Sequence, residues 1–270
     1  MNILDKILAQ KKIEVEIRRE SCPTADLEKS VFFNRKAISF TQSILCADKS
    51  GFIAEHKRKS PSKGVINSSL ILEKVVKGYE NAGASAVSVL TDTDFFGGDN
   101  KDLTEARVLL NIPVLRKDFI VDEYQLVEAK SIGADVILLI AAALEPKRLQ
   151  ELAKFANFIG LEVLMEVHNR EELLDNLFDE IDVIGVNNRN LKDFQESIDT
   201  SLQLSELIPN KFVKISESSI DKAETIFTLK EAGYKGFLIG EYFMKQDDPG
   251  LACKKLAEEV KALSKNKYTT

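Results

Sequence analysis

Short apolar runs alternate with amphipathic segments along most of this chain. Eight runs are rich in Val, Ile and Leu, and they cover residues 52–57, 86–90, 113–117, 135–140, 163–167, 183–187, 213–216 and 237–240. The segments between them space their apolar residues as helices do, for example over residues 69–82 and 146–158. Turns that contain Gly83, Gly133 or Gly233 end three of these helices shortly before the next apolar run. The pattern therefore predicts strands and helices in alternation.

This alternation predicts the fold class. Near-continuous apolar strands are typical of parallel sheets that are covered by helices. Eight strand and helix units predict an α/β fold, the closed (β/α)8 or TIM barrel. A doubly wound open sheet is the alternative, but no glycine-rich fingerprint of the dinucleotide or P-loop type follows the first strand. We expect residues 1–270 to form a single barrel domain.

Residues 1–50 precede the first predicted strand, and we expect them to form an N-terminal helical extension of the barrel. Ile3, Leu4, Ile7 and Leu8 fall on one face of a helix, whereas the opposite face is polar. This amphipathic helix is predicted to lie against the barrel.

The chain is also predicted to end in a helix. Asp248 and Pro249 have the residue types of an N-cap and a first helical turn, and the helical pattern runs from there to Leu263. Residues 265–270 are expected to fray, because chain ends are poorly ordered unless they are tied down.

Composition and charge limit the classes of partner. The 270 residues are 44% hydrophobic and 30% charged, which is typical of a globular protein. The longest apolar run, residues 136–144, is too short to span a bilayer, and the first ten residues lack the apolar stretch of a signal peptide. A net charge of −6 argues against general nucleic-acid binding. We expect a cytoplasmic protein with no membrane or nucleic-acid partner, as a monomer, with an oligomer left open.

The three cysteines carry little information about function. Cys22, Cys46 and Cys253 are odd in number, far apart in sequence, and lack C-x-x-C spacing. This pattern predicts neither a disulfide framework nor a zinc site.

Charged side chains end several of the predicted strands. Glu55 and Lys57 share one face of the first strand, because side chains two residues apart point the same way. Lys117 ends the third strand, and Glu166 lies near the end of the fifth. Strand ends often carry polar residues, so one such residue is weak evidence. In a barrel, however, these ends surround the active site, and two lysines with two glutamates there predict acid–base chemistry.

The loops after the last two strands are candidates for phosphate binding. Barrels often hold phosphate there through backbone N–H groups and the start of a short helix. Ser218 supplies a hydroxyl in the first of these loops, and Gly240 allows close approach of the backbone in the second. Ordinary turn chemistry explains the same residues equally well.

The number and spacing of the histidines do not predict a metal site. His168 shares a strand face with Glu166, but the chain has only two histidines and no H-E-x-x-H spacing. We interpret His168 as a residue that contacts or orients the substrate. His56 should face the helices, and we interpret it as a core or boundary residue.

Seven motifs between about residues 51 and 245 resemble those of the indole-3-glycerol-phosphate synthase family. They are FIAEHKRKSPSKG, SVLTDTDFFGG, PVLRKDFIVDEYQL, LEVLMEVH, IGVNNRNL, ISESSI and FLIGEYFM. The resemblance implies ring closure of 1-(2-carboxyphenylamino)-1-deoxyribulose 5-phosphate to indole-3-glycerol phosphate. Carbon dioxide and water are released, neither a metal nor a cofactor takes part, and the reaction belongs to tryptophan biosynthesis.

The resemblance also implies catalytic roles. Lys117 would be the general acid that protonates the ribulose carbonyl, and Glu166 would be the general base in the later dehydration, with Glu55 beside it. Lys57 would hold the substrate carboxylate and help with proton transfer. Asn187 would orient the substrate. Aromatic residues near Lys117 lower the local polarity, which favours a partly depressed Lys117 pKa.

Binding roles follow from the same resemblance. Arg189 would orient substrate hydroxyls and anionic groups, and Ser60 belongs to the mobile first loop. The apolar wall for the anthranilate ring would consist of Phe96, Phe119 and Leu138, and the phosphate cradle of Ser218, Ser219, Gly240 and Glu241. Backbone amides would provide most of the cradle.

One departure from the family pattern affects the cradle. In the family, the loop after the seventh strand usually has the sequence SESGI, whereas this chain has Ser219 in place of the glycine. An unusual backbone angle at this position is therefore in doubt.

Two alternatives to the indole-forming lyase stay open at this point. The first is an aldolase in which Lys117 forms a Schiff base with a carbonyl substrate. The second is a barrel that binds phosphate without catalysis. Fold alone does not decide among them, because barrels host many reactions.

Overall fold

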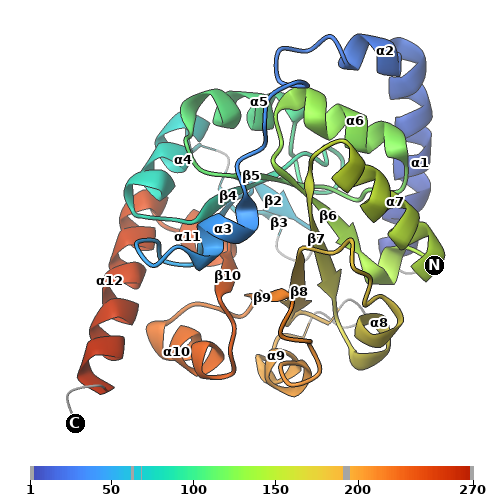
Figure 1. Cartoon of the computed structure of the whole chain (residues 1–270). Helices are drawn as coiled ribbons and strands as arrows, with labels where there is room; N and C mark the ends of the chain where they lie inside the picture. The colour runs from blue at the N-terminus through green and yellow to red at the C-terminus, as the bar shows by residue number, and fades with distance from the viewer. Residues whose placement is uncertain (1–2, 62–63, 68, 191–194, 268–270) are drawn as a thin grey trace.

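The computed structural model describes residues 3–61, 64–67, 69–190 and 195–267 (Figure 1). Eight parallel strands close into one barrel, in the order β1-β10-β9-β8-β7-β6-β5-β4. They are β1 (Phe52–His56), β4 (Ala86–Leu90), β5 (Val114–Lys117), β6 (Val136–Ile140), β7 (Glu162–Val167), β8 (Val183–Asn187), β9 (Val213–Glu217) and β10 (Gly236–Ile239). Each predicted strand overlaps one of these, so the predicted (β/α)8 barrel is confirmed.

Helices alternate with the strands and surround the barrel (Figure 1). They are α4 (Leu72–Asn81), α5 (Asn100–Leu109), α6 (Glu123–Ile132), α7 (Pro146–Phe158), α8 (Arg170–Asp175), α9 (Asp199–Leu204), α10 (Ala223–Glu231), α11 (Glu241–Met244) and α12 (Pro249–Lys267). A hairpin of β2 (Lys59–Ser60) and β3 (Gly64–Val65) follows β1. Gly83, Gly133 and Gly233 have φ values of 82°, 96° and 89°, which confirms the predicted glycine turns.

Two predicted helix boundaries were wrong. Helix α4 begins at Leu72 and not at residue 69, because the Asn67 side chain accepts hydrogen bonds from the backbone N–H and hydroxyl of Ser69 and holds a turn there. Helix α12 begins as predicted, with Asp248 accepting a hydrogen bond from the Leu251 N–H. It continues to Lys267, past the predicted end at Leu263. Residues 268–270 lie outside the described residues.

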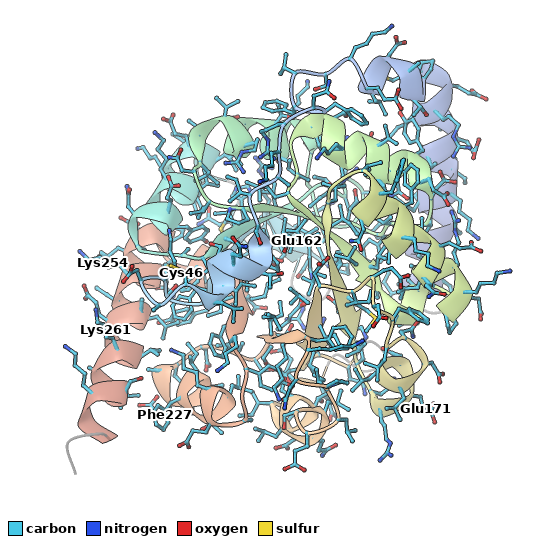
Figure 2. All side chains as sticks on the ribbon, viewed as in Figure 1. Cys46, Glu162, Glu171, Phe227, Lys254 and Lys261 are labelled. Carbon is cyan, nitrogen blue, oxygen red and sulfur yellow. The ribbon has the colours of Figure 1, made fainter. Side chains whose placement is uncertain are left out.

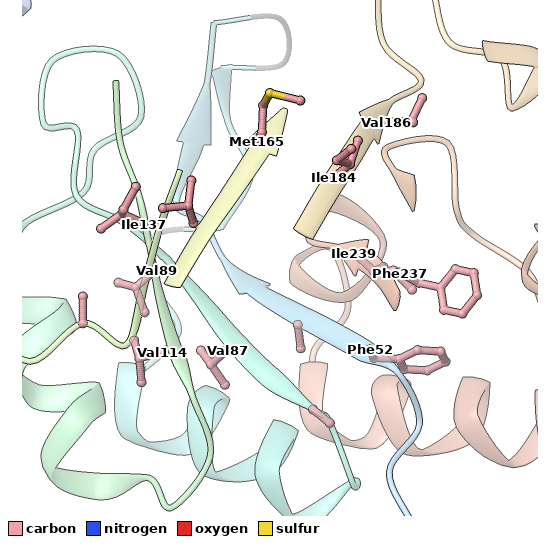
Figure 3. Close-up of a cluster of buried hydrophobic side chains, with 14 of the residues drawn as sticks. Phe52, Val87, Val89, Val114, Ile137, Met165, Ile184, Val186, Phe237 and Ile239 are labelled. Atoms are coloured by element: carbon pink, nitrogen blue, oxygen red, sulfur yellow. The ribbon is translucent and has the colours of Figure 1, made fainter. Parts of the chain in front are cut away.

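Two apolar layers form the core. The outer layer packs the strands against the helices and includes Phe52, Val87 and Phe237 (Figure 3). The inner layer fills the barrel, and its strand residues include Ile53, Leu115, Leu164 and Ile215. Two positions further along each of those four strands, the inward side chain is charged: Glu55, Lys117, Glu166 and Glu217. The apolar rows inside the barrel therefore end in a ring of charges at its C-terminal mouth.

The N-terminal extension covers both ends of the barrel. Helix α1 (Ile3–Ser21) packs beside α6 and buries Ile7, which confirms the predicted contact with the barrel. Helix α3 (Phe40–Leu45) sends Phe40 and Ile44 into the inner apolar layer. Helix α2 (Thr24–Leu27) lies between them in sequence.

Helix α3 is fixed at the N-terminal end of the strands. Glu162, at the start of β7, accepts hydrogen bonds from the backbone N–H and the hydroxyl of Thr41, and it lies beside α3 (Figure 2). Cys22, Cys46 and Cys253 are free cysteines. Across the part of the chain that is described, no helix combines the length and apolarity needed to cross a bilayer.

Candidate active site

A cavity of about 390 Å³ opens at the C-terminal mouth of the barrel. Its lining includes every catalytic, substrate-binding and phosphate-binding residue that the family resemblance implied. These side chains come from β1, β5, β6, β7 and β8 and from the loops that follow the strands. The barrel thus brings the predicted residues together, and their individual roles stay predictions. His168, interpreted from the sequence as contacting or orienting the substrate, is not among the lining residues.

Lys117 lies at the centre of the charged ring. Its Nζ atom is 2.8 Å from Oε2 of Glu166 and 2.8 Å from Oε2 of Glu217. Glu217 was not among the site residues predicted from the sequence. The signal was present, since Glu217 follows the inward-facing Ile215 by two residues.

Burial and pairing set the charge states around Lys117. Burial disfavours its ammonium, but the carboxylates, above all Glu166 and Glu217, outweigh burial and raise the Lys117 pKa. The predicted depressed pKa was therefore wrong, because neighbouring carboxylates matter more than the nearby aromatic rings. Burial also favours a neutral Glu166, yet Lys117 and His168 hold the Glu166 pKa well below its usual range. Burial and the Glu166 charge raise the pKa of Glu217 to about 7.

A second ion pair lies on the β1 side of the cavity. The Lys57 ammonium is 2.6 Å from Oε1 of Glu55. Gly240 leaves the room for this carboxylate, because a Cβ atom at position 240 would collide with Oε1 of Glu55. Gly240 has a φ of −121°, so space and not backbone conformation explains the glycine. Ser60, in β2, is buried at the same edge of the cavity.

An apolar wall lies on the β4 to β6 side. The rings of Phe96 and Phe119 are 5.9 Å apart between centroids, and Leu138 of β6 is buried beside the cavity. Helix α1 adds Ile3, Leu4 and Ile7 to the same lining. The sequence predicted the apolar face of this helix but not its place at the cavity.

A buried lysine of α1 holds the loops that carry the two phenylalanines. Lys11 is fully buried and lies 2.8 Å from Asp92 and 3.0 Å from Asp118. Asp92 accepts the backbone N–H of Phe96, and Asp118 accepts that of Phe119. The Lys11 ammonium thus neutralises both of the carboxylates that shape the apolar wall.

The guanidinium group of Arg189 lies on the opposite side of the cavity from the apolar wall. Arg189 lies 2.5 Å from Glu196 and 3.2 Å from Glu241, and Glu241 also pairs with Lys245 at 2.6 Å. The backbone N–H of Arg189 donates to the Asn187 side chain at 3.0 Å. An anion that binds Arg189 must therefore compete with two carboxylates.

The loop after β9 has the unusual backbone that was in doubt. Ser218 has a φ of 66° and Ser219 a φ of 58°, so both adopt the left-handed conformation without a glycine. Hydrogen bonds hold this turn, from Ser218 Oγ to Asn187 Oδ1 at 2.9 Å and from Ser219 Oγ to Glu196 Oε2 at 3.3 Å.

The two histidines differ in environment. His56 is buried on the outer side of β1, and burial lowers its pKa to about 4, which agrees with a core residue. His168 lies beside Glu166, behind the cavity lining. Within the described residues, no group of three or more His, Cys, Asp or Glu side chains is arranged to hold a metal ion.

Comparisons with known proteins agree with this geometry. A family model described as Indole-3-glycerol phosphate synthase matches residues 4–256. The chain is 46% identical to the indole-3-glycerol phosphate synthase of Bacteroides thetaiotaomicron, over 92% of this chain and 95% of the relative. It is 42% identical to the enzymes of that name from Burkholderia vietnamiensis, over 93% of this chain and 97% of the relative, and from Polynucleobacter asymbioticus, over 94% and 98%.

Proposed function

The chain belongs to the indole-3-glycerol phosphate synthase family, and from that premise we propose that it closes the indole ring of 1-(2-carboxyphenylamino)-1-deoxyribulose 5-phosphate. The product is indole-3-glycerol phosphate, a step of tryptophan biosynthesis, and carbon dioxide and water are released. The observation that carries the proposal is Lys117, which lies between two buried carboxyl groups in a cavity with an apolar wall on one side and Arg189 on the other.

Ring closure needs an acid at the ketone. The ring carbon that bears the carboxylate attacks the ketone carbon, and the carbonyl oxygen takes a proton from the Lys117 ammonium and becomes a hydroxyl. The raised Lys117 pKa keeps this group protonated at neutral pH. The new carbon–carbon bond interrupts the aromatic ring, and loss of carbon dioxide returns the electron pair to it.

Dehydration needs a base and an acid. Glu166 takes a proton from the methylene carbon next to the ring nitrogen, and the hydroxyl on the neighbouring carbon leaves as water after it gains a proton. Glu166 is suited to the first task because it is held in the ionised form. Lys57, fixed by Glu55, supplies the second proton once the carboxylate that it held has left as carbon dioxide.

The cavity walls fit the two ends of the substrate. Phe96, Phe119 and Leu138 hold the anthranilate ring on the apolar side. Arg189 and Asn187 hold the hydroxyl and anionic groups on the other side. Backbone amides of the loops after β9 and β10, at Ser218, Ser219, Gly240 and Glu241, hold the phosphate.

The direct test is turnover by the purified protein. The protein is mixed with the carboxyphenylamino sugar phosphate, and the fluorescence of the indole product is followed together with release of carbon dioxide. We expect both signals to rise at the same rate. Absence of turnover would favour a barrel that binds phosphate without catalysis.

Borohydride distinguishes the aldolase alternative. A lysine that forms a Schiff base is trapped covalently when borohydride is added with a carbonyl substrate, whereas a lysine that acts as an acid leaves no adduct. We expect the mass of the protein to stay unchanged after this treatment. A substrate adduct on Lys117 would support the aldolase.

A further inference from the structure

The Glu166 carboxylate has a second cationic neighbour behind the cavity. Nε2 of His168 lies 3.3 Å from Oε1 of Glu166, whereas Lys117 is bound to the other oxygen, Oε2, at 2.8 Å. The His168 side chain is 8% exposed. Among the described residues, Nε2 makes no hydrogen bond of good geometry. Its interaction with Oε1 of Glu166 is therefore an ion-pair contact.

Glu172 of α8 fixes the orientation of this imidazole. Its Oε2 atom accepts the backbone N–H of His168 at 2.8 Å and lies 3.1 Å from Nδ1 of the ring. Asn169 holds Glu172 in turn, since its side chain donates to Oε1 at 2.6 Å and accepts the Glu172 N–H at 2.9 Å. The sequence HNREE therefore builds a turn that points Nε2 at Glu166.

The groups around the ring favour the imidazolium ion. Within the described residues, the charged groups that face His168 are Glu166 from β7 and Glu172 from α8. The 3-10 helix η1 (Ala141–Ala143), which packs against α8, brings only alanines. Burial favours the neutral ring, but the two carboxylates outweigh it and raise the His168 pKa to about 9.

We propose that His168, held by Glu172, is a positioning residue that keeps Glu166 aimed and ionised while Lys117 acts on the substrate. This inference rests on the proposed function, in which Lys117 donates to the ketone. Lys117 cannot donate there and stay on Glu166, so Glu166 loses that cation during the reaction. It is then left close to Glu217 with His168 as the counter-ion, and without His168 the like charge and burial would raise the Glu166 pKa.

Replacing the His168 imidazole tests whether its positive charge is needed. The variant His168→Gln keeps an N–H donor of similar reach but removes the positive charge. We expect kcat to fall about tenfold with KM within about twofold, because the change acts on the base and not on binding. We also expect the acid limb of the kcat profile to move up by about one pH unit, since Glu166 then takes up a proton at higher pH. A role in folding alone would leave the position of that limb unchanged.

Replacing Glu172 tests whether its negative charge is needed to keep the His168 ring protonated. In Glu172→Gln the imidazole remains but loses one of the two charges that raise its pKa. Its kcat should match the parent near about pH 6 and fall below the parent by about tenfold near about pH 8.5, where the ring becomes neutral. Glu171→Gln, the same change at an exposed position of α8 (Figure 2), is the control and should behave as the parent.

The outcomes separate this inference from the function on which it rests. If Glu166→Gln is inactive and His168→Gln has the parent's acid limb, the positioning role is overturned and the proposed function stands. A loss confined to KM in His168→Gln would also overturn it. If the parent protein does not turn over the sugar phosphate, the proposed function itself fails. If Glu166→Gln keeps full kcat, Glu166 is not the base, and the positioning role of His168 falls while the overall reaction stands.

Discussion

The ammonium of Lys117 is as close to Glu217 as it is to Glu166, at 2.8 Å from each. One cation therefore serves two buried carboxyl groups from strands on different sides of β8. Ionisation costs more free energy for Glu217 than for Glu166. Glu166 has His168 as a second cationic neighbour, whereas Glu217 has no second cation of comparable proximity among the described residues. Glu217 is accordingly the group that takes up a proton near neutral pH.

Glu217 should produce a visible step in the pH profile. As the pH rises through about 7, Glu217 loses its proton, and the added negative charge makes the Lys117 ammonium a weaker acid. We expect kcat of the parent to decline above this pH. Glu217→Gln should lose this step and show a kcat about tenfold lower at acidic pH, because Lys117 loses one of its anchors. The exposed Glu224→Gln serves as the control, and an unchanged step in Glu217→Gln would contradict the assignment.

Gly240 should be replaceable only when Glu55 is shortened. In Gly240→Ala the new methyl group displaces the Glu55 carboxylate from Lys57, and we expect kcat/KM to fall about tenfold or more. In the Glu55→Ala background the same substitution should cost less than about twofold, because the carboxylate is absent and only the contact with the Cβ atom of residue 55, at 3.0 Å, remains. Steady-state kinetics of the four proteins give this coupling. Additive losses would show that Gly240 acts independently of Glu55.

Lys11 should contribute strongly to the stability of the fold, although it lies far in sequence from the residues that line the cavity. In Lys11→Met two buried carboxylates lose a shared cation, and we expect the free energy of unfolding to fall by about 3 kcal/mol, measured by urea denaturation. KM should also rise, because Asp92 and Asp118 hold the loops of Phe96 and Phe119. The adjacent and exposed Lys12→Met should change neither quantity.

Ser219 should tolerate glycine and reject a β-branched side chain. Its φ of 58° strains any residue with a Cβ atom. Ser219→Gly should leave the stability within about 1 kcal/mol of the parent, and Ser219→Val should lower it by about 2 kcal/mol, because branching makes the left-handed conformation less accessible. Thermal unfolding of the two variants provides the measurement. Equal stability of both would mean that the loop relaxes to another conformation.

The sequence predicted the features that depend on local order. Apolar runs and helical spacing located all eight strands, and the alternation of side chains located Glu55, Lys117 and Glu166 at the barrel mouth. Features that depend on groups distant in sequence were missed. The buried Lys11 looks like a surface lysine until Asp92 and Asp118 are seen around it.

The Lys117 pKa was misjudged for the same reason. The sign of the Lys117 pKa shift depends on carboxylates from β7 and β9, which the chain brings together only on folding. Glu217 was given no role, although it follows the inward-facing Ile215 by two residues. The doubt over Ser219 came from treating glycine as a requirement, whereas hydrogen bonds from Ser218 and Ser219 hold the turn.

In the proposed mechanism, the Lys117 ammonium delivers the proton that drives ring closure. The most direct test measures kcat and substrate binding for Lys117→Ala beside the exposed control Lys101→Ala. We expect Lys117→Ala to bind the sugar phosphate still but to form the fluorescent product at least about a hundredfold more slowly, because a general acid is lost. A Lys117→Ala protein with the same kcat as the Lys101→Ala control would contradict this mechanism.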